Sequence, residues 1–143
     1  MRVLVDGDAC PDKDEIYALC LQYHVEMIVF ADYAHISNEY EYQVVYCEVG
    51  HDSVDKIILN HVQNHDIIIT QDYGLSSLLL LKQCYVLHPS GMIVSNENID
   101  TLLMHRYIGS INRNRDKHIK GPKKRTVDVK ERFLNQLERL LTI

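Results

Sequence analysis

The sequence predicts a three-layer α/β/α fold with a mostly parallel central sheet and a basic, helical C-terminal segment. Short uncharged apolar runs, typical of strands buried on both faces, alternate with longer segments whose apolar residues recur at helical spacing. This alternation favours right-handed crossovers, which place helices on both faces of one sheet. With 143 residues, 46% of them hydrophobic, the chain can bury one core and form one domain.

The first half of the chain is expected to contain three strands and two helices. Pro11 and the acids after it are typical of a helix start, because acidic side chains are stabilised by the helix dipole, and this helix should end near residue 23. Asp52 or Ser53 caps a second helix, whose apolar residues continue to Val62 at helical spacing. The expected strands cover residues 2–5, 25–30 and 43–49.

The second half continues the alternation and then becomes basic. We expect strands at residues 67–70, 85–87 and 92–94, the last two forming a hairpin, with a helix at residues 75–82. Asn98 caps a helix that ends near Tyr107, and a loop covers residues 109–125. The last helix carries an apolar stripe that must pack on something, most simply the domain itself, formed by Val129, Phe133, Leu137, Leu140 and Leu141.

We therefore expect one α/β domain over residues 1–108, on which a basic loop and helix over residues 109–143 pack. The longest uncharged apolar run, residues 75–81, is too short to span a bilayer, and the acid at position 6 excludes a signal peptide. The four cysteines form no C-x-x-C pair, so we expect buried free thiols. These features predict a soluble, cytoplasmic protein without a membrane partner; its oligomeric state stays open, a homodimer included.

The net charge of −5 conceals a strong asymmetry. Residues 1–104 hold 16 acidic and four basic residues, a balance of −12, whereas residues 105–143 hold four acidic and eleven basic residues, a balance of +7. Such a distribution indicates either a polyanionic partner or docking of the basic segment on the acidic body.

Carboxylates follow three of the expected strands. The first strand ends in Asp6-Gly7-Asp8, the helix after the third begins with Asp52-Ser53-Val54-Asp55, and the fourth ends in Thr70-Gln71-Asp72. Because ligands collect where the carboxyl ends of parallel strands meet, we expect these side chains to lie close together. Asp66 precedes its strand and belongs to the opposite edge, where we expect a structural role.

Clustered carboxylates raise each other's pKa unless a cation neutralises them. Mg²⁺ or Mn²⁺ is the natural cation, since both take oxygen ligands and need few protein carboxylates. We expect Asp6, Asp8, Asp55 and Asp72 to hold the metal and act in catalysis, with Asp52 as an outer or additional ligand.

An acidic metal site beside a basic segment predicts a metal-dependent nuclease. A phosphodiester would reach the carboxylates through the metal, while basic residues hold its backbone. RNA is the expected partner, ahead of DNA. The candidate phosphate contacts are Arg106, Arg113, Arg115, Lys117, Lys120, Lys123, Lys124 and Arg125.

Five motifs in order, covering nearly the whole chain, resemble those of the YaiI/YqxD family of bacterial proteins. They are Val5-Asp6-Gly7-Asp8-Ala9-Cys10-Pro11, Asp52-Ser53-Val54-Asp55, Ile68-Ile69-Thr70-Gln71-Asp72, His88-Pro89-Ser90-Gly91 and Gly121-Pro122.

That family is similar to PIN-like domains, and the resemblance implies a three-layer α/β fold with an aspartate site for Mg²⁺ or Mn²⁺, typically in a ribonuclease. Asp6 matches the aspartate that ends the first strand, Asp55 the acid at the helix start, and Asp72 the acid of the Thr-x-Asp segment. Asp8 and Asp52 match positions of the narrower family.

Two other functions stay open. The Asp6-x-Asp8 start also fits a haloacid-dehalogenase-like phosphatase with Asp6 as nucleophile, but such enzymes need a lysine, and neither lysine nor arginine occurs between Lys13 and Lys56. A non-catalytic nucleic-acid-binding module with the same fold is the other alternative, in which the basic segment alone binds.

Overall fold

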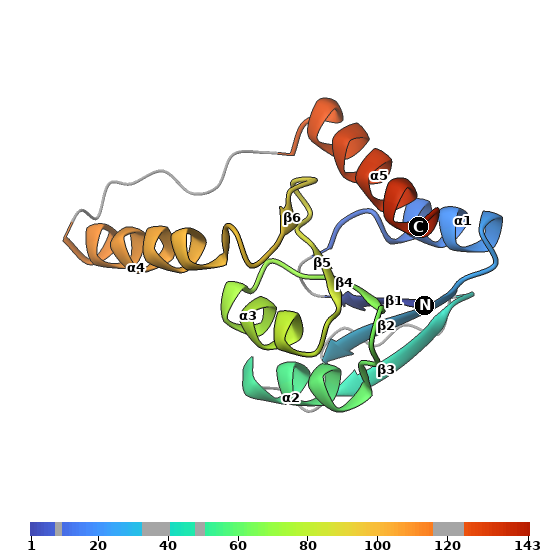
Figure 1. The fold of residues 1–143 in the computed structure, drawn as a ribbon, viewed down its shortest axis with the longest axis horizontal. Coiled ribbons are helices and arrows are strands. Elements are labelled where there is room, and N and C mark those ends of the chain that lie inside the picture. The colour runs from blue at the N-terminus through green and yellow to red at the C-terminus, as the bar shows by residue number, and fades with distance from the viewer. Residues whose placement is uncertain (8–9, 33–40, 48–50, 116–124) are drawn as a thin grey trace.

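A six-stranded sheet organises the part of the chain that the structure describes (Figure 1). The computed structural model describes residues 1–7, 10–32, 41–47, 51–115 and 125–143, without the side chains of residues 51–53 and 113–115. The strands are β1 (Arg2–Asp6), β2 (Glu26–Asp32), β3 (Gln43–Cys47), β4 (Ile67–Ile69), β5 (Tyr85–Leu87) and β6 (Ile93–Val94). The helices are α1 (Lys13–Gln22), α2 (His51–His61), α3 (Tyr73–Leu81), α4 (Ile99–Arg115) and α5 (Val127–Leu141).

The strand order is β3-β2-β1-β4-β5-β6. The first five strands are parallel, and β6 pairs antiparallel with β5, so the expected hairpin is confirmed. Val5 of β1 is in register with Val29 of β2 and Ile69 of β4. The residues that follow Val5 and Ile69, Asp6 and Thr70, therefore stand side by side at the carboxyl edge of the sheet.

Alternate residues of the buried strands face two separate apolar layers, which confirms the three-layer fold. Val3 and Val5 belong to a core cluster completed by α1 and α5, while Leu4 belongs to a second cluster completed by α2, α3 and the start of α4. Figure 1 shows α1 beside α5 on one side of the sheet and α2 beside α3 on the other. Strands buried on both faces need continuous apolar sequence, as in Ile67–Ile69.

Helix α5 packs on the body through its apolar stripe and through charged residues around it. Phe133 and Leu137 are fully buried against the sheet cluster. The Arg125 guanidinium lies 2.6 Å from the Asp12 carboxylate, donates to the carbonyl of Pro89 and covers the Phe133 ring. Intramolecular docking therefore accounts for part of the charge asymmetry.

Close approach of the turn before β6 to α5 requires a glycine. Gly91 has φ of +91°, and a Cβ there would lie 2.9 Å from the Arg132 side chain and 3.0 Å from the Phe133 backbone nitrogen. A larger residue would be strained and would push α5 away from the turn.

The boundaries of two helices differ from the sequence prediction. Helix α3 begins at Tyr73 instead of residue 75, because the Asp72 side chain caps it. Helix α4 continues past Tyr107 to Arg115, so the expected boundary between residues 108 and 109 lies inside a helix. The apolar residues at helical spacing continue on both sides of Gly109, at Ile108 and Ile111. A single glycine inside a helix lowers its stability by only about 1 kcal/mol, so the helix continues past it.

The opposite edge of the sheet confirms the structural role of Asp66. Its buried carboxylate accepts hydrogen bonds from the backbone and guanidinium of Arg2 and from the backbone of Gln63. All four cysteines are free and buried, as expected, and burial raises the pKa of the Cys10 thiol to about 11. Of the helices described, none has the length and apolar character required to cross a bilayer.

The contact between Arg125 and Asp12 makes a prediction about stability. We expect Arg125→Met to lower the free energy of unfolding by about 3 kcal/mol, because it leaves the mostly buried Asp12 carboxylate without its counterion. Urea unfolding followed by circular dichroism measures this change.

The Lys130–Glu15 pair supplies the control, since both its side chains are exposed to solvent by more than a third. Lys130→Met should leave stability nearly unchanged. The double variant Asp12→Ala/Arg125→Met should lose less stability than Arg125→Met alone, because no unpaired carboxylate remains. Equal losses of stability in Arg125→Met and in the double variant would contradict the proposed cost of burying an unpaired carboxylate.

Candidate functional site

The sheet changes its winding direction between β1 and β4. From β1 the chain proceeds outward to β2 and β3, then returns across β1 to β4 and continues outward to β5. The connections that leave β1 and β4 therefore diverge, and in open α/β sheets ligands bind outside the carboxyl ends of two such strands. Asp6 ends β1 at this point, and Thr70 and Asp72 follow β4.

A buried hydroxyl joins the two segments. Thr70 Oγ1 donates to Asp6 Oδ2 at 3.0 Å and accepts a hydrogen bond from the backbone nitrogen of Asp72 at 3.1 Å. Thr70 is fully buried, whereas Asp6 and Asp72 are partly exposed. Through Thr70 the structure thus joins the carboxylate of Asp6 to the backbone of Asp72, and we call these three residues the Asp6–Thr70–Asp72 cluster.

The carboxylate of Asp72 has a structural role as well. Its Oδ1 accepts from the backbone nitrogen of Leu75 at 3.0 Å, which caps the N-terminus of α3. The backbone carbonyl of Asp72 accepts from both the backbone nitrogen and the hydroxyl of Ser76. These bonds hold the carboxylate at the edge of the sheet.

Arg106 brings positive charge from α4 to the cluster. Its Nη1 lies 3.5 Å from Asp72 Oδ1, and its side chain is 56% exposed, so this ion pair is solvated and weak. A Cβ at Gly74 would lie 3.2 Å from Asp72 Oδ1 and 3.6 Å from Arg106 Nη1. Glycine at this position leaves room for the pair.

His88 follows β5 at the same edge of the sheet. Its Nδ1 accepts a hydrogen bond from the backbone nitrogen of Ser90, so the proton of the neutral ring is on Nε2. Burial, helped by the charge of Arg125, lowers the pKa of His88 below its usual value. Its ring stacks on Tyr73 with centroids 5.6 Å apart.

Sequence reasoning quoted His88 within a family motif, gave it no role at the site and missed this arrangement. The signal that could have found it is its position directly after a strand, at the edge where the aspartates also lie. The same reasoning expected Thr70 to end a strand and did not foresee its bridging hydroxyl.

Among the other expected acids, Asp55 alone has a side chain that the structure describes. Asp55 lies on α2 and is partly buried. Asp52 lies in the first turn of α2, but its side chain is outside the description, and Asp8 lies outside the described residues. Within the described ranges, no three His, Cys, Asp or Glu side chains lie close enough together to hold a metal ion.

The expected basic residues fall into three groups. Arg106 lies at the cluster, and Arg113 and Arg115 lie in the last turns of the same helix. The charge of Arg125 is used within the protein, against Asp12. The rest lie outside the described residues: Lys117, Lys120, Lys123 and Lys124.

The donor chemistry of the cluster fits a hard divalent cation. The side-chain ligands that it offers are oxygen atoms, which Mg²⁺ and Mn²⁺ prefer, whereas Zn²⁺ is usually held by nitrogen or sulfur. Mg²⁺ retains several waters and needs only one or two carboxylates from the protein. In number, the carboxylates of Asp6 and Asp72 meet this requirement.

Comparisons with known proteins place the whole chain in one set of relatives. The pattern of the family described as "Uncharacterized BCR, YaiI/YqxD family" matches residues 4–143. The chain is 40% identical over 141 residues to UPF0178 protein Bcer98_3021 of Bacillus cytotoxicus, covering 99% of this chain and 93% of the relative. It is 42% identical over 142 residues to a UPF0178 protein of Natranaerobius thermophilus, covering 99% and 96%. No solved structure matches the chain significantly.

The double role of Asp72 predicts that two substitutions will differ in stability. Asp72→Ala should lower the free energy of unfolding by about 1 kcal/mol, because the cap of α3 is lost. Asp72→Asn should be nearly as stable as the wild type, since asparagine is an equally good N-cap. Thermal and urea unfolding compare the two, and equal losses would show that the cap contributes little.

His88 predicts a dependence of stability on pH. In the unfolded chain its imidazole takes up a proton below about pH 6.5, whereas the folded state with its lowered pKa resists protonation. The unfolded state then binds more protons, so stability falls as the pH decreases through this range. The pH interval from about 7.5 to about 5.5 brackets the usual pKa of histidine. Over this interval the free energy of unfolding should fall less in His88→Asn than in the wild type.

The exposed His105 on α4 provides the control. In urea unfolding at a series of pH values, His105→Asn should follow the wild type. Parallel profiles for the wild type and His88→Asn would contradict the burial effect.

Proposed function

We propose that this chain, which belongs to the YaiI/YqxD family, hydrolyses phosphodiester bonds of nucleic acid, RNA before DNA, with Mg²⁺ or Mn²⁺. The single observation that supports this proposal most is the Asp6–Thr70–Asp72 cluster at the change of winding direction. Carboxylates outside the ends of parallel strands are well placed to meet a ligand.

The carboxylates of Asp6 and Asp72 would hold the metal. Asp8, Asp52 and Asp55 are proposed as further ligands. When bound, the ion would supply an activated water and would neutralise charge on the phosphate. A resemblance to PIN-like domains supports the same assignment.

The residues of the chain itself would position ligand and substrate. The hydroxyl of Thr70 keeps the Asp6 carboxylate turned toward the segment that carries Asp72. Arg106 is weakly held by Asp72, so its guanidinium can turn to a phosphate oxygen at low cost. Arg113 follows seven positions after Arg106, on the same side of α4, and would extend the proposed path of the nucleic acid together with Lys120, Lys123 and Lys124. Arg115 falls on the opposite side of α4 and is proposed as a phosphate contact at the end of the helix.

The decisive test is cleavage of single-stranded RNA by the full chain with and without Mn²⁺. Asp6→Asn and Asp72→Asn should each lower the rate at least about 100-fold, because the metal stabilises the transition state by several kcal/mol. Both variants should also weaken Mn²⁺ binding in calorimetry. Asp72→Asn retains the cap of α3, so its loss of activity would not reflect unfolding.

Asp128→Asn is the matched control, because Asp128 is an exposed acid on α5, which packs on the face of the sheet away from α2 and α3. It should bind Mn²⁺ and cleave RNA like the wild type. If both site variants bind Mn²⁺ as well as the wild type, the proposed metal site is wrong.

The alternatives give different results in the same assays. RNA binding that persists in Asp6→Ala and Asp72→Ala, without Mn²⁺-dependent cleavage, would indicate a non-catalytic binding module. Hydrolysis of a simple phosphomonoester through a phosphorylated Asp6 would indicate a haloacid-dehalogenase-like phosphatase.

A further inference from the structure

Helix α4 carries apolar residues on two different faces. The first face belongs to the body: Ile99 is buried, and Leu102 and Leu103 pack partly against the cluster that contains α3. The second face is exposed to solvent and continues along the helix at positions i, i+3, i+4 and i+7. It consists of Met104 (57% exposed), Tyr107 (64%), Ile108 (47%) and the partly exposed Ile111, which we call the α4 stripe.

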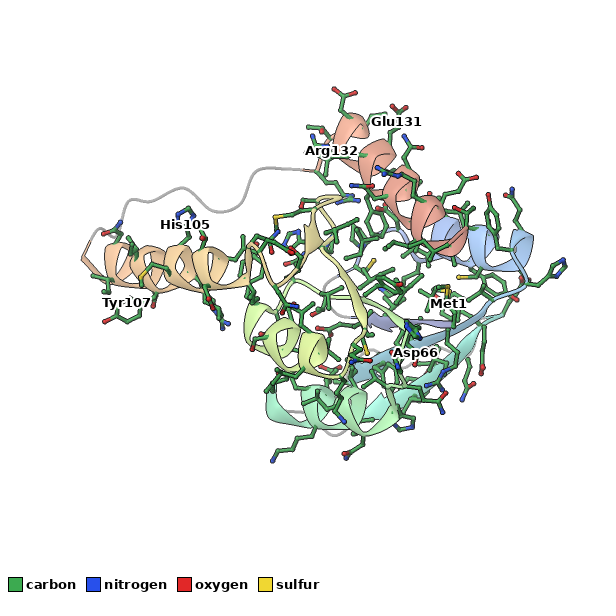
Figure 2. The ribbon with its side chains drawn as sticks, viewed as in Figure 1. Met1, Asp66, His105, Tyr107, Glu131 and Arg132 are labelled. Atoms are coloured by element: carbon green, nitrogen blue, oxygen red, sulfur yellow. The ribbon has the colours of Figure 1, made fainter. Side chains whose placement is uncertain are left out.

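The α4 stripe points away from the body. At about 100° per residue, its four positions span about 100° of the helix circumference. Ile99 and Arg106, which contact the body, lie on the opposite side of this circle. Figure 1 shows α4 extending from the body like an arm, and Figure 2 shows Tyr107 and His105 on opposite sides of its ribbon.

Charge is distributed unevenly along α4. Glu97 and Asp100 are exposed at its base, where it leaves the body, whereas the last turns carry Arg113 and Arg115 in the sequence. Asp100 and position 115 fall on the same side of the helix as the α4 stripe. The arm is therefore acidic at one end and basic at the other, with an apolar centre between them.

This pattern is complementary to itself when two arms run antiparallel. A register centred between positions 107 and 108 places Met104 of one copy opposite Ile111 of the other and Tyr107 opposite Ile108. The same register places position 100 opposite position 115, an acidic residue opposite a basic one. A parallel pair would place like charges opposite each other.

We propose that the α4 stripe binds a second copy of this chain, forming a two-fold symmetric dimer of antiparallel α4 helices. Such an interface is isologous, since each copy presents the same surface. The opposed helix dipoles and the end charges favour this orientation. The basic end of each arm then lies along the base of the partner's arm, on the side away from the Asp72–Arg106 pair.

The interface is small, because α4 has 17 residues and a length of only about 25 Å. Small interfaces are weak and transient, so we expect a dissociation constant on the order of 10 µM. Sedimentation equilibrium of the full chain up to about 200 µM therefore covers the transition. We expect the mass to rise from 16.6 kDa toward twice that value.

Ile108→Glu should raise the dissociation constant at least about tenfold, because it places a charge at the centre of the stripe. Leu81→Glu is the matched control: Leu81 is an 80% exposed apolar residue on α3, outside the α4 stripe. It should dimerise like the wild type. Both sites are exposed, and circular dichroism verifies that both variants fold.

The antiparallel register has its own test. Asp100→Arg should weaken the dimer, because like charges then meet at both ends of the helix pair. Asp100→Arg/Arg115→Asp should restore dimerisation, because opposite charges meet again. Failure of the double variant to recover overturns the register.

A wild type that stays monomeric throughout the concentration range overturns the proposal, as does an Ile108→Glu variant that dimerises like the wild type. A monomeric wild type whose RNA affinity falls in Ile108→Glu would show instead that nucleic acid occupies the stripe.

Discussion

The candidate site depends on a single hydroxyl group. Thr70 donates to Asp6, 64 residues earlier in the chain, and accepts from the backbone of Asp72, so it joins the end of β1 to the start of α3. Because Thr70 is buried, a missing hydroxyl would leave the Asp72 amide without its bond inside the protein. Valine has nearly the same shape as threonine but cannot make either bond.

The arrangement around Asp72 shows how one carboxylate serves stability and chemistry together. One of its oxygens already caps α3, and a weak ion pair with Arg106 compensates part of its charge. An N-terminal helix cap holds a negative charge at the positive end of the helix dipole. The protein itself therefore holds the Asp72 carboxylate in place. A ligand that binds to it would cause a smaller loss of side-chain conformational entropy.

The basic C-terminal segment has more than one role. Arg125 and Lys130 bind Asp12 and Glu15, so part of its charge holds α5 on the body. Arg106 lies instead at the cluster, and the arm that carries it also exposes an apolar stripe. Charge counts alone cannot separate these roles, because they depend on which acids lie within a few ångströms of each basic residue.

The sequence by itself determined the order of strands and helices and the edge at which Asp6 and Asp72 lie, since these follow from short-range apolar periodicity and from the parallel sheet. Family motifs likewise identified the YaiI/YqxD relationship along the whole chain. Only the tertiary structure decided that Thr70 bridges the two aspartates, that the half-buried ring of His88 stacks on Tyr73, and that Arg125 faces inward. It also extended α4 into an arm whose stripe faces away from the body. These features join residues far apart in the chain, and the packing of the layers, which local sequence patterns do not encode, sets their distances.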